Sequence, residues 1–116
     1  LVVEDNLHIR DNMVEILELE NYEVYAASNG KEGLDKAKEI FPNLILCDIQ
    51  MPVMDGYQLL KSVQELPDLA ESRFIFFTSY SEPKDILYGL RMGADEFLVK
   101  PFSGEDLLKV VEKHLG

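Results

Sequence analysis

The sequence predicts an α/β domain in which five parallel strands form one sheet with helices on both faces. Short apolar runs alternate five times with amphipathic stretches of helical spacing, and such alternation is typical of parallel sheets with right-handed crossovers. The central run, residues 44–47, is continuously apolar, which indicates a strand covered on both faces. With 116 residues, the chain is long enough for one domain with a real core and too short for two.

The first strand and helix follow from the opening residues. Residues 1–3 are aliphatic and end in two acids, so they predict a short strand. Asn6 is a suitable N-cap for a helix over about residues 7–20, whose apolar positions recur at helical spacing. Because the chain opens inside this strand, we expect one domain over residues 1–116 that lacks the first residues of its first strand.

The second strand and helix occupy the next twenty residues. Residues 22–27 carry β-branched and aromatic side chains, which favour a strand. Residues 29–32 (Asn-Gly-Lys-Glu) resemble a capping box with Asn in the Ser/Thr place. They open a helix through about Ile40, and Pro42 ends it.

The third and fourth strands flank a third helix. Asp55-Gly56 marks a turn into a helix that ends near Pro67, after the central strand. Residues 67–72 predict a polar, mobile connection. Residues 73–78 are apolar until Thr78 and predict the fourth strand.

The last third of the chain supplies two helices around a fifth strand. Residues 81–92 predict a helix with Pro83 in its first turn and Gly93 as its C-terminal stop. Residues 97–99 predict the strand. Residues 103–106 then cap a final helix, whose buried face is expected to hold Leu107, Leu108, Val111 and Leu115.

Composition narrows the classes of function. The chain has 22 acidic and 11 basic residues, a net charge of −11, which argues against direct binding of nucleic acid. Apolar residues make up 47%, which excludes disorder. The single cysteine, Cys47, is expected to be a buried structural thiol. No membrane-spanning run or signal-peptide pattern is visible, so we expect a cytoplasmic domain without a membrane partner.

Polar side chains follow four of the five predicted strands at the point where each strand ends. They are Glu4 and Asp5, Asp48, Thr78, and Lys100. The carboxyl ends of parallel strands meet at one edge of an open α/β sheet, where ligands bind. We therefore expect these five side chains to lie together.

This set of residues can support metal binding and phosphoryl transfer. Three carboxylates repel one another unless a cation intervenes, and Mg²⁺ suits a sparse oxygen site. Asp48 could be a nucleophile that forms an acyl phosphate, with Lys100 and Thr78 holding the phosphoryl oxygens. Taken singly, each residue has a plainer alternative: loop acids in solvent, a loop-capping Asp, a surface lysine or a locally bonded hydroxyl.

The chain resembles a response-regulator receiver domain of the chemotaxis-regulator type. The matching motifs span nearly all 116 residues in the order of that family. They are Val2-Val3-Glu4-Asp5-Asn6, Asp48 within Leu46-Cys47-Asp48-Ile49-Gln50-Met51-Pro52-Val53-Met54-Asp55-Gly56, Thr78-Ser79, and Gly93-Ala94 followed by Phe97 and Lys100-Pro101-Phe102.

The resemblance implies a flavodoxin-like (βα)5 fold with strand order 2-1-3-4-5. It implies that Asp48 accepts phosphate from a phosphohistidine of a histidine kinase or phosphotransfer protein. Asp5, Asp48 and the backbone carbonyl of Gln50 would hold Mg²⁺, with Glu4 acting through water. Lys100 would bind the phosphoryl group, and the Lys100-Pro101 bond would be cis.

The resemblance also implies a switch from Thr78 and Phe97 to an output face formed by the fourth helix, fifth strand and fifth helix. That face includes Asp85, Tyr88 and Arg91. Such a domain is a signalling module rather than an enzyme, although it assists its own phosphorylation and dephosphorylation, and it controls an attached or separate output or forms a phosphorylation-dependent dimer. Alternatively, Phe97 is ordinary strand core and the three face residues are simply solvent-facing.

Two further positions bear on the lifetime of an acyl phosphate. Gln50 lies two residues after Asp48, and Tyr80 lies two after Thr78, so both would flank the approach of a hydrolytic water. We hypothesise that Tyr80 slows dephosphorylation. His8 and His114 are expected to be plain solvated side chains.

Three other classes of protein fit the residues less well. A phosphatase of the haloacid-dehalogenase type would need a second acid at the position of Gln50. A flavodoxin would need a Gly- or Ser/Thr-rich phosphate loop after the first strand, where this chain is acidic. A degenerate receiver used only for docking would not need the intact set of five.

Overall fold

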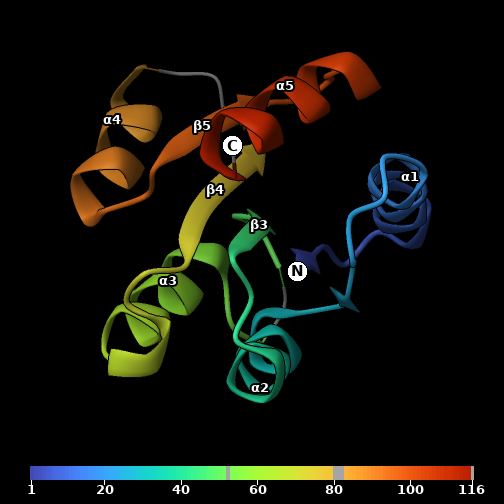
Figure 1. Ribbon diagram of the computed structural model, residues 1–116. Helices are drawn as coiled ribbons and strands as arrows, with labels where there is room; N and C mark the ends of the chain where they lie inside the picture. The colour runs from blue at the N-terminus through green and yellow to red at the C-terminus, as the bar shows by residue number, and fades with distance from the viewer. Residues whose placement is uncertain (52, 80–82, 116) are drawn as a thin grey trace.

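Five strands form one parallel sheet in the order β2-β1-β3-β4-β5 (Figure 1). This is a computed structural model, and it describes residues 1–51, 53–79 and 83–115. The strands are β1 (Val2–Val3), β2 (Ala26–Ala27), β3 (Leu44–Asp48), β4 (Arg73–Thr78) and β5 (Glu96–Val99). The helices are α1 (Leu7–Leu19), α2 (Gly30–Ile40), α3 (Gly56–Gln64), the 3₁₀ turn η1 (Pro67–Leu69), α4 (Pro83–Met92) and α5 (Gly104–Leu115).

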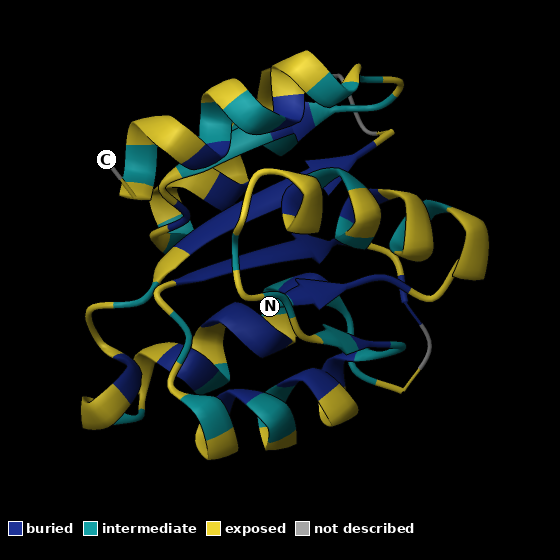
Figure 2. Cartoon of the chain, turned by 45° about the vertical axis from the view of Figure 1, so that its right-hand side comes forward, coloured by how far each residue is buried: buried dark blue, intermediate teal, exposed yellow. Residues whose placement is uncertain are grey.

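Helices cover both faces of the sheet and bury two separate apolar layers. Met13 and Leu17 of α1 and Leu107 of α5 pack in one layer. The other layer holds Leu59 and Leu60 of α3 and side chains of α2 and η1. Figure 2 shows the buried strands between two rows of helices whose outer sides are exposed. The predicted α/β class and the strand order 2-1-3-4-5 are therefore confirmed.

The central strand β3 is buried along its whole length, as its continuous apolar run predicts. It pairs in parallel with β1, where Val3 lies opposite Cys47, and with β4, where Asp48 lies opposite Phe77. Cys47 is fully buried. Asp48 thus ends a strand whose five residues are all buried.

Polar caps fix the starts of the helices. The Asn6 and Asn29 side chains accept hydrogen bonds from the backbone N–H groups of Ile9 and Glu32. Asp55 and Gln58 form a full capping box at α3. In α2 the box is only half formed, because the Glu32 carboxylate bonds the Ser28 hydroxyl instead of the Asn29 N–H. Such caps satisfy N–H groups that have no partner within a helix.

Three predictions about the elements are wrong in detail. The predicted strand 22–27 is reduced to Ala26–Ala27, because β1 offers only two residues to pair with it. The predicted polar connection 67–72 contains a 3₁₀ turn that buries Leu69. Leu115, expected on the buried face of the last helix, is exposed.

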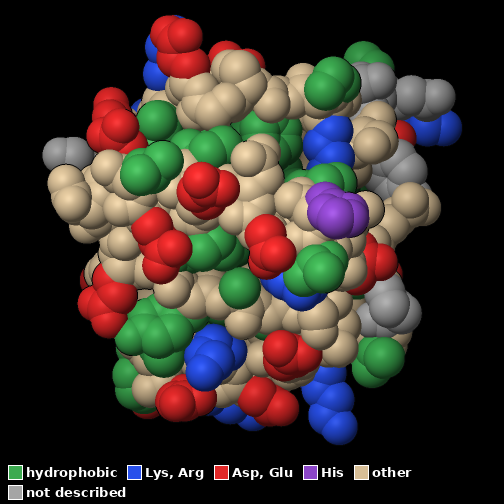
Figure 3. Space-filling model, turned by 90° about the vertical axis from the view of Figure 1, so that its right-hand side faces the viewer, with side chains coloured by type: hydrophobic (Ala, Val, Ile, Leu, Met, Phe, Trp, Pro, Cys, Tyr) green, Lys and Arg blue, Asp and Glu red, His purple; other side chains and the backbone are tan. Residues whose placement is uncertain are grey.

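The surface is acidic, and Figure 3 shows Asp and Glu side chains spread across the face that carries α1. Within the described residues, no helix is both long and apolar enough to cross a membrane.

Candidate functional site

The ends of β1 and β3 bring three acids together. Val3 pairs with Cys47, so Glu4 and Asp48, the next residues on each strand, emerge side by side. One carboxylate oxygen from each of Glu4, Asp5 and Asp48 lies within 4.8 Å of the others. Glu4 and Asp48 are buried, whereas Asp5 is exposed, so the cluster opens to solvent on the Asp5 side.

Lys100 places one positive charge against this cluster. Its Nζ donates to Glu4 Oε1 at 2.9 Å and to Asp48 Oδ2 at 3.1 Å. The same ammonium lies 5.2 Å from the centre of the Phe77 ring, within cation–π range. Burial works against the charge, but the hydrogen bonds to the two carboxylates outweigh it and raise the pKa of Lys100. Lys100 is therefore a firmly charged ammonium aimed at Asp48.

Glu4 is the least solvated of the three acids, with 1% of its surface exposed. Burial, followed by the neighbouring Asp48 carboxyl, raises the pKa of Glu4 to about 7, while Lys100 opposes the shift. Its Oε2 atom is buried and has no hydrogen-bond partner within the described residues. A buried carboxylate oxygen without a donor is costly, so a cation or a bridging water would satisfy it.

A glycine lets the next helix start directly beside Asp48. The Gly56 N–H donates to the Ile49 carbonyl at 2.8 Å. A Cβ on Gly56 would lie 2.5 Å from the Asp48 carbonyl oxygen, so no larger residue fits without moving the strand end. The capping box at Asp55 holds the first turn of α3 in this place.

Thr78 and Phe97 lie on the neighbouring strands β4 and β5. Thr78 is buried, and its carbonyl accepts a 2.7 Å hydrogen bond from the Lys100 N–H. This bond joins the ends of β4 and β5, and the Lys100–Pro101 peptide bond that follows is cis. Phe97 is half-buried, and its ring packs 5.3 Å from that of Phe76. Across from it on α4, Gly89 has no Cβ; one built there would lie 2.5 Å from the Phe97 ring.

The remaining predicted residues differ in exposure. Gln50 is exposed, while Tyr80 falls outside the described residues. On the expected output face, Tyr88 and Arg91 are exposed and Asp85 is half-buried, and the Tyr88 ring makes an edge contact with Tyr57. His8 is exposed, as expected.

The expectation of a plainly solvated His114 is wrong. Its Nε2 lies 2.7 Å from Glu96 Oε2, and only 12% of its side chain is exposed. No pattern in the sequence pairs a residue of β5 with one at the end of α5. Two further residues were not predicted from the sequence: Arg10, whose guanidinium donates to the Glu4 carbonyl at 2.9 Å, and Gly89, which faces the Phe97 ring.

The donor set fits a hard divalent cation. Glu4, Asp5 and Asp48 each offer a carboxylate oxygen, a ligand that Mg²⁺ and Ca²⁺ prefer to sulfur or nitrogen. The unsatisfied Glu4 oxygen and the close approach of three carboxylates both favour a bound cation. Glu4, Asp5 and Asp48 are thus the residues that could hold a metal.

The strand order 2-1-3-4-5 with helices on both faces defines a flavodoxin-like domain, and an acid cluster and a lysine lie together at the carboxyl edge of its sheet. The model for the response regulator receiver domain matches residues 1–112. The chain therefore belongs to the response regulator receiver domain family, the signalling domain of two-component response regulators.

Individual relatives agree with this assignment. The chemotaxis protein CheY of Bacillus subtilis is 34% identical over 117 residues, covering 100% of this chain and 96% of that protein. Among solved structures, chemotaxis protein CheY4 of Vibrio cholerae has a TM-score of 0.92 at 33% identity, covering 97% of this chain and 94% of that one.

Other relatives carry the same domain in longer chains. The probable transcriptional regulator ycf27 of Porphyra purpurea is 39% identical over 107 residues, which are 92% of this chain and 43% of that protein. The chain thus spans less than half the length of several curated relatives that it matches.

Proposed function

We propose that this domain receives a phosphoryl group on Asp48 from a phosphohistidine of a histidine kinase or phosphotransfer protein, with Mg²⁺ as cofactor. The observation that carries the proposal is the double hydrogen bond from Lys100 Nζ to Glu4 and Asp48, beside the Asp5 carboxylate. Family membership supports it.

Asp48, Lys100 and Thr78 would each have a different role in the phosphoryl transfer. An Asp48 carboxylate oxygen would attack phosphorus while the N–P bond to the donor imidazole breaks, so the nitrogen leaves with the bonding electrons. Lys100 would move from the carboxylates towards the incoming phosphoryl oxygens and neutralise their charge. Thr78, at the end of the adjacent strand, would donate a hydrogen bond from its hydroxyl to one of those oxygens.

The acid cluster would hold the metal. Asp5, Asp48 and the backbone carbonyl of Gln50 would be ligands, with Glu4 acting through water, as the oxygen donor set allows. The ion supplies neutralisation of the charge that builds up in a loose phosphoryl transfer. Gln50 and Tyr80 would tune the lifetime of the acyl phosphate by controlling the approach of water.

The phosphorylated state would be signalled through α4, β5 and α5. Thr78 and Phe97 would couple the site to that face, which carries Tyr88 and Arg91 in solvent. The output would be an attached domain, a separate protein or a dimer formed through this face. Phosphorylation can shift such an equilibrium only if the two states bind the phosphoryl group differently.

Phosphorylation by a small molecule tests the acceptor directly. The protein is incubated with acetyl phosphate and MgCl₂, and mass spectrometry locates the added phosphoryl group. We expect one adduct on Asp48 that disappears in Asp48→Asn and when EDTA removes the metal. Asp55→Asn, which changes a nearby acid outside the cluster, is the matched control and keeps the adduct. An adduct on another residue, or none with metal present, contradicts the proposal.

A further inference from the structure

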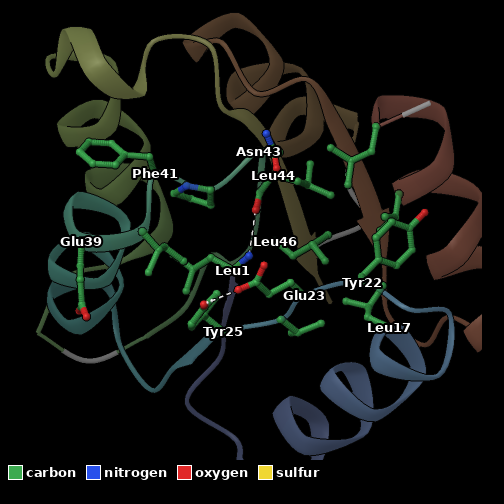
Figure 4. Close-up of a pocket in the computed structure, with 15 residues that line it drawn as sticks. Leu1, Leu17, Tyr22, Glu23, Tyr25, Glu39, Phe41, Asn43, Leu44 and Leu46 are labelled. Atoms are coloured by element: carbon green, nitrogen blue, oxygen red, sulfur yellow. Dashed lines mark hydrogen bonds between the residues drawn. The ribbon is translucent and has the colours of Figure 1, made fainter.

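Glu4 and Asp5 lie on a short turn, residues 4–6, that connects β1 to α1. The strand before this turn is firmly held, because β1 pairs in parallel with both β2 and β3. At the other end of β1, beside a groove of about 440 Å³, the Leu1 amino group donates to the Leu44 carbonyl at 2.9 Å (Figure 4). The two acids therefore follow a fixed strand, and their own placement depends on how the turn is held.

A side chain of α1 holds this turn. Arg10 lies at the end of the first turn of the helix, and the side chains of a helix lean towards its amino end. The Arg10 guanidinium therefore reaches back, and its Nη1 donates to the Glu4 carbonyl at 2.9 Å. The Arg10 backbone N–H donates to the Asn6 carbonyl at 2.9 Å. One residue is thus bonded to both ends of the turn.

The Glu4 carbonyl belongs to the peptide unit that joins the two acids. Because β1 fixes the chain up to Glu4, the direction of this C=O sets ψ of Glu4. The planar peptide unit then places the N and Cα atoms of Asp5. Asp5 is exposed, so packing does little to hold its carboxylate beside those of Glu4 and Asp48. The bond from Arg10 therefore sets the point from which the Asp5 side chain extends.

Lys100 and Arg10 hold Glu4 at different atoms. Lys100 donates to the Glu4 carboxylate at 2.9 Å, whereas Arg10 donates to the backbone carbonyl of the same residue. In the proposed phosphoryl transfer, Lys100 turns towards the incoming phosphoryl oxygens and releases the carboxylate. The bond from Arg10 involves no carboxylate, so nothing in that step requires it to break.

We propose that Arg10 is a positioning residue for the metal site. By bonding the Glu4 carbonyl, it keeps the Asp5 carboxylate within reach of a cation shared with Asp48. In this role Arg10 acts through the backbone and contacts neither the metal nor the phosphoryl group. The inference rests on the proposed function, because it concerns the Mg²⁺ that the domain would bind.

The positive charge of Arg10, taken alone, predicts the opposite effect. A guanidinium near the acids repels a cation, so its removal would strengthen Mg²⁺ binding if only charge mattered. If the bond to the turn matters, its removal weakens Mg²⁺ binding, since the loss of groups that orient metal ligands typically costs about 10–100-fold in affinity. The sign of the change therefore separates the two effects.

The test measures the Kd of Mg²⁺ for the unmodified protein, Arg10→Gln and Arg10→Lys by NMR titration, well below the thermal midpoint of each. We expect Kd to rise about tenfold in Arg10→Gln. It should rise at least as much in Arg10→Lys, because an ammonium keeps the repulsion but lacks the planar fork of a guanidinium.

The matched control is Lys38→Gln, which removes an exposed positive charge in the last turn of α2. Because solvent and salt screen a distant charge, this variant should keep Kd within about twofold of the unmodified value.

A second measurement does not need the metal. In the metal-free proteins, the NMR order parameters of the Asp5 and Asn6 amides report fast motion of the turn. We expect both order parameters to fall in Arg10→Gln and to stay unchanged in Lys38→Gln. A loss of order confined to the turn would distinguish positioning from a general loosening of the fold.

The results that overturn the inference differ from those that overturn the proposed function. If the unmodified protein binds Mg²⁺ and Arg10→Gln binds it equally or more tightly, the positioning role is wrong and the proposed function stands. Unchanged order parameters at Asp5 and Asn6 in Arg10→Gln would also overturn the positioning role. An unmodified protein that does not bind Mg²⁺ would overturn both proposals.

Discussion

Val53, in the loop between β3 and α3, has φ of 72° and is 79% exposed. A β-branched residue rarely adopts a positive φ, and such conformations cost about 1–3 kcal/mol. Neither burial nor helix capping by this side chain offsets the cost of the positive φ, so interactions elsewhere in the fold must offset it. A residue without a Cβ would relieve it.

We therefore expect Val53→Gly to raise the free energy of unfolding by about 1 kcal/mol. Urea denaturation measures the change. Val53→Ala is the control, because it removes the branch and keeps the Cβ, so it should recover only part of the gain. A destabilised Val53→Gly would show that the loop adopts another conformation in solution.

Gly89 is the second residue whose size matters. An alanine inside a helix ordinarily adds about 1 kcal/mol of stability over glycine. Here its Cβ would lie 2.5 Å from two atoms of the Phe97 ring, and crowding of this kind costs about 1–3 kcal/mol. Gly89 therefore sets how closely the ring can approach α4.

We expect Gly89→Ala to destabilise the domain by about 1 kcal/mol and to move the Phe97 ring, seen as a change in its NMR shifts. In the background of Phe97→Leu the same substitution should become neutral or stabilising, which a double-mutant cycle measures. Gly104→Ala is the control, since its Cβ would lie 3.3 Å from the end of the Ile16 side chain. Equal effects in both backgrounds would mean that the ring does not contact Gly89.

At the scale of elements, β5 is joined to the end of α5 by charges. Glu96 accepts from Lys113 Nζ at 3.1 Å and lies 2.7 Å from His114. Burial acts to raise the pKa of Glu96, but the hydrogen bonds from His114 and Lys113 outweigh it and lower the pKa. A lowered carboxyl pKa adds stability above the unfolded-state value of about 4.5, and this stability is lost as the pH falls through the folded-state value.

Glu96→Gln should therefore lower the free energy of unfolding at pH 7. This difference from the unmodified protein should disappear in acid, where Glu96 is protonated. The expected difference is below about 1 kcal/mol, because the pair is partly exposed to solvent. Urea midpoints of the protein and of Glu96→Gln, measured from pH 7 down to pH 3, check it. Glu112→Gln, an exposed acid on the same helix, is the control. A difference that stays constant with pH would exclude the ionic contribution.

Some strands were predictable from the sequence and others were not. The continuous apolar runs of β3 and β4 predicted those strands to within a residue, because burial on both faces leaves a simple pattern. The stretch 22–27 has the same β-forming composition, yet only Ala26–Ala27 pairs. A strand forms only where a neighbouring strand pairs with it. The composition of residues 22–27 does not show that the neighbour, β1, has only two residues.

At the scale of the whole molecule, the sequence predicted that polar residues at strand ends would converge. Glu4, Asp5, Asp48 and Lys100 do lie together, because parallel strands share one carboxyl edge. The arrangement of Gly89 against Phe97 and of His114 against Glu96 was not predictable. Each joins a helix to a strand, the first by packing and the second by a hydrogen bond, and a single sequence has no periodic signal for either.

The excess of acid makes the domain responsive to cations. With a net charge of −11, added NaCl should stabilise it by screening the repulsion between its acids. A metal site at the acid cluster predicts a further stabilisation. At a concentration of roughly 100 times Kd, Mg²⁺ should raise the free energy of unfolding by about 2.7 kcal/mol more than NaCl of equal ionic strength does.

Thermal midpoints in MgCl₂ and in NaCl measure this difference. Asp5→Asn should abolish the extra effect of MgCl₂, whereas Asp11→Asn, an exposed acid on α1, should keep it. If MgCl₂ and NaCl act alike in the unmodified protein, the acid cluster does not bind the metal.

The single thiol of the molecule lies next to the proposed acceptor. Cys47 is fully buried in the central strand, donates to the Asp48 carbonyl at 3.0 Å, and has its thiol pKa raised well above the usual value by burial. An alkylating reagent can therefore reach the sulfur only when the apolar layer between the sheet and α2 and α3 opens. The rate of labelling thus measures how often this layer opens, with no engineered probe, and it can be compared before and after phosphorylation.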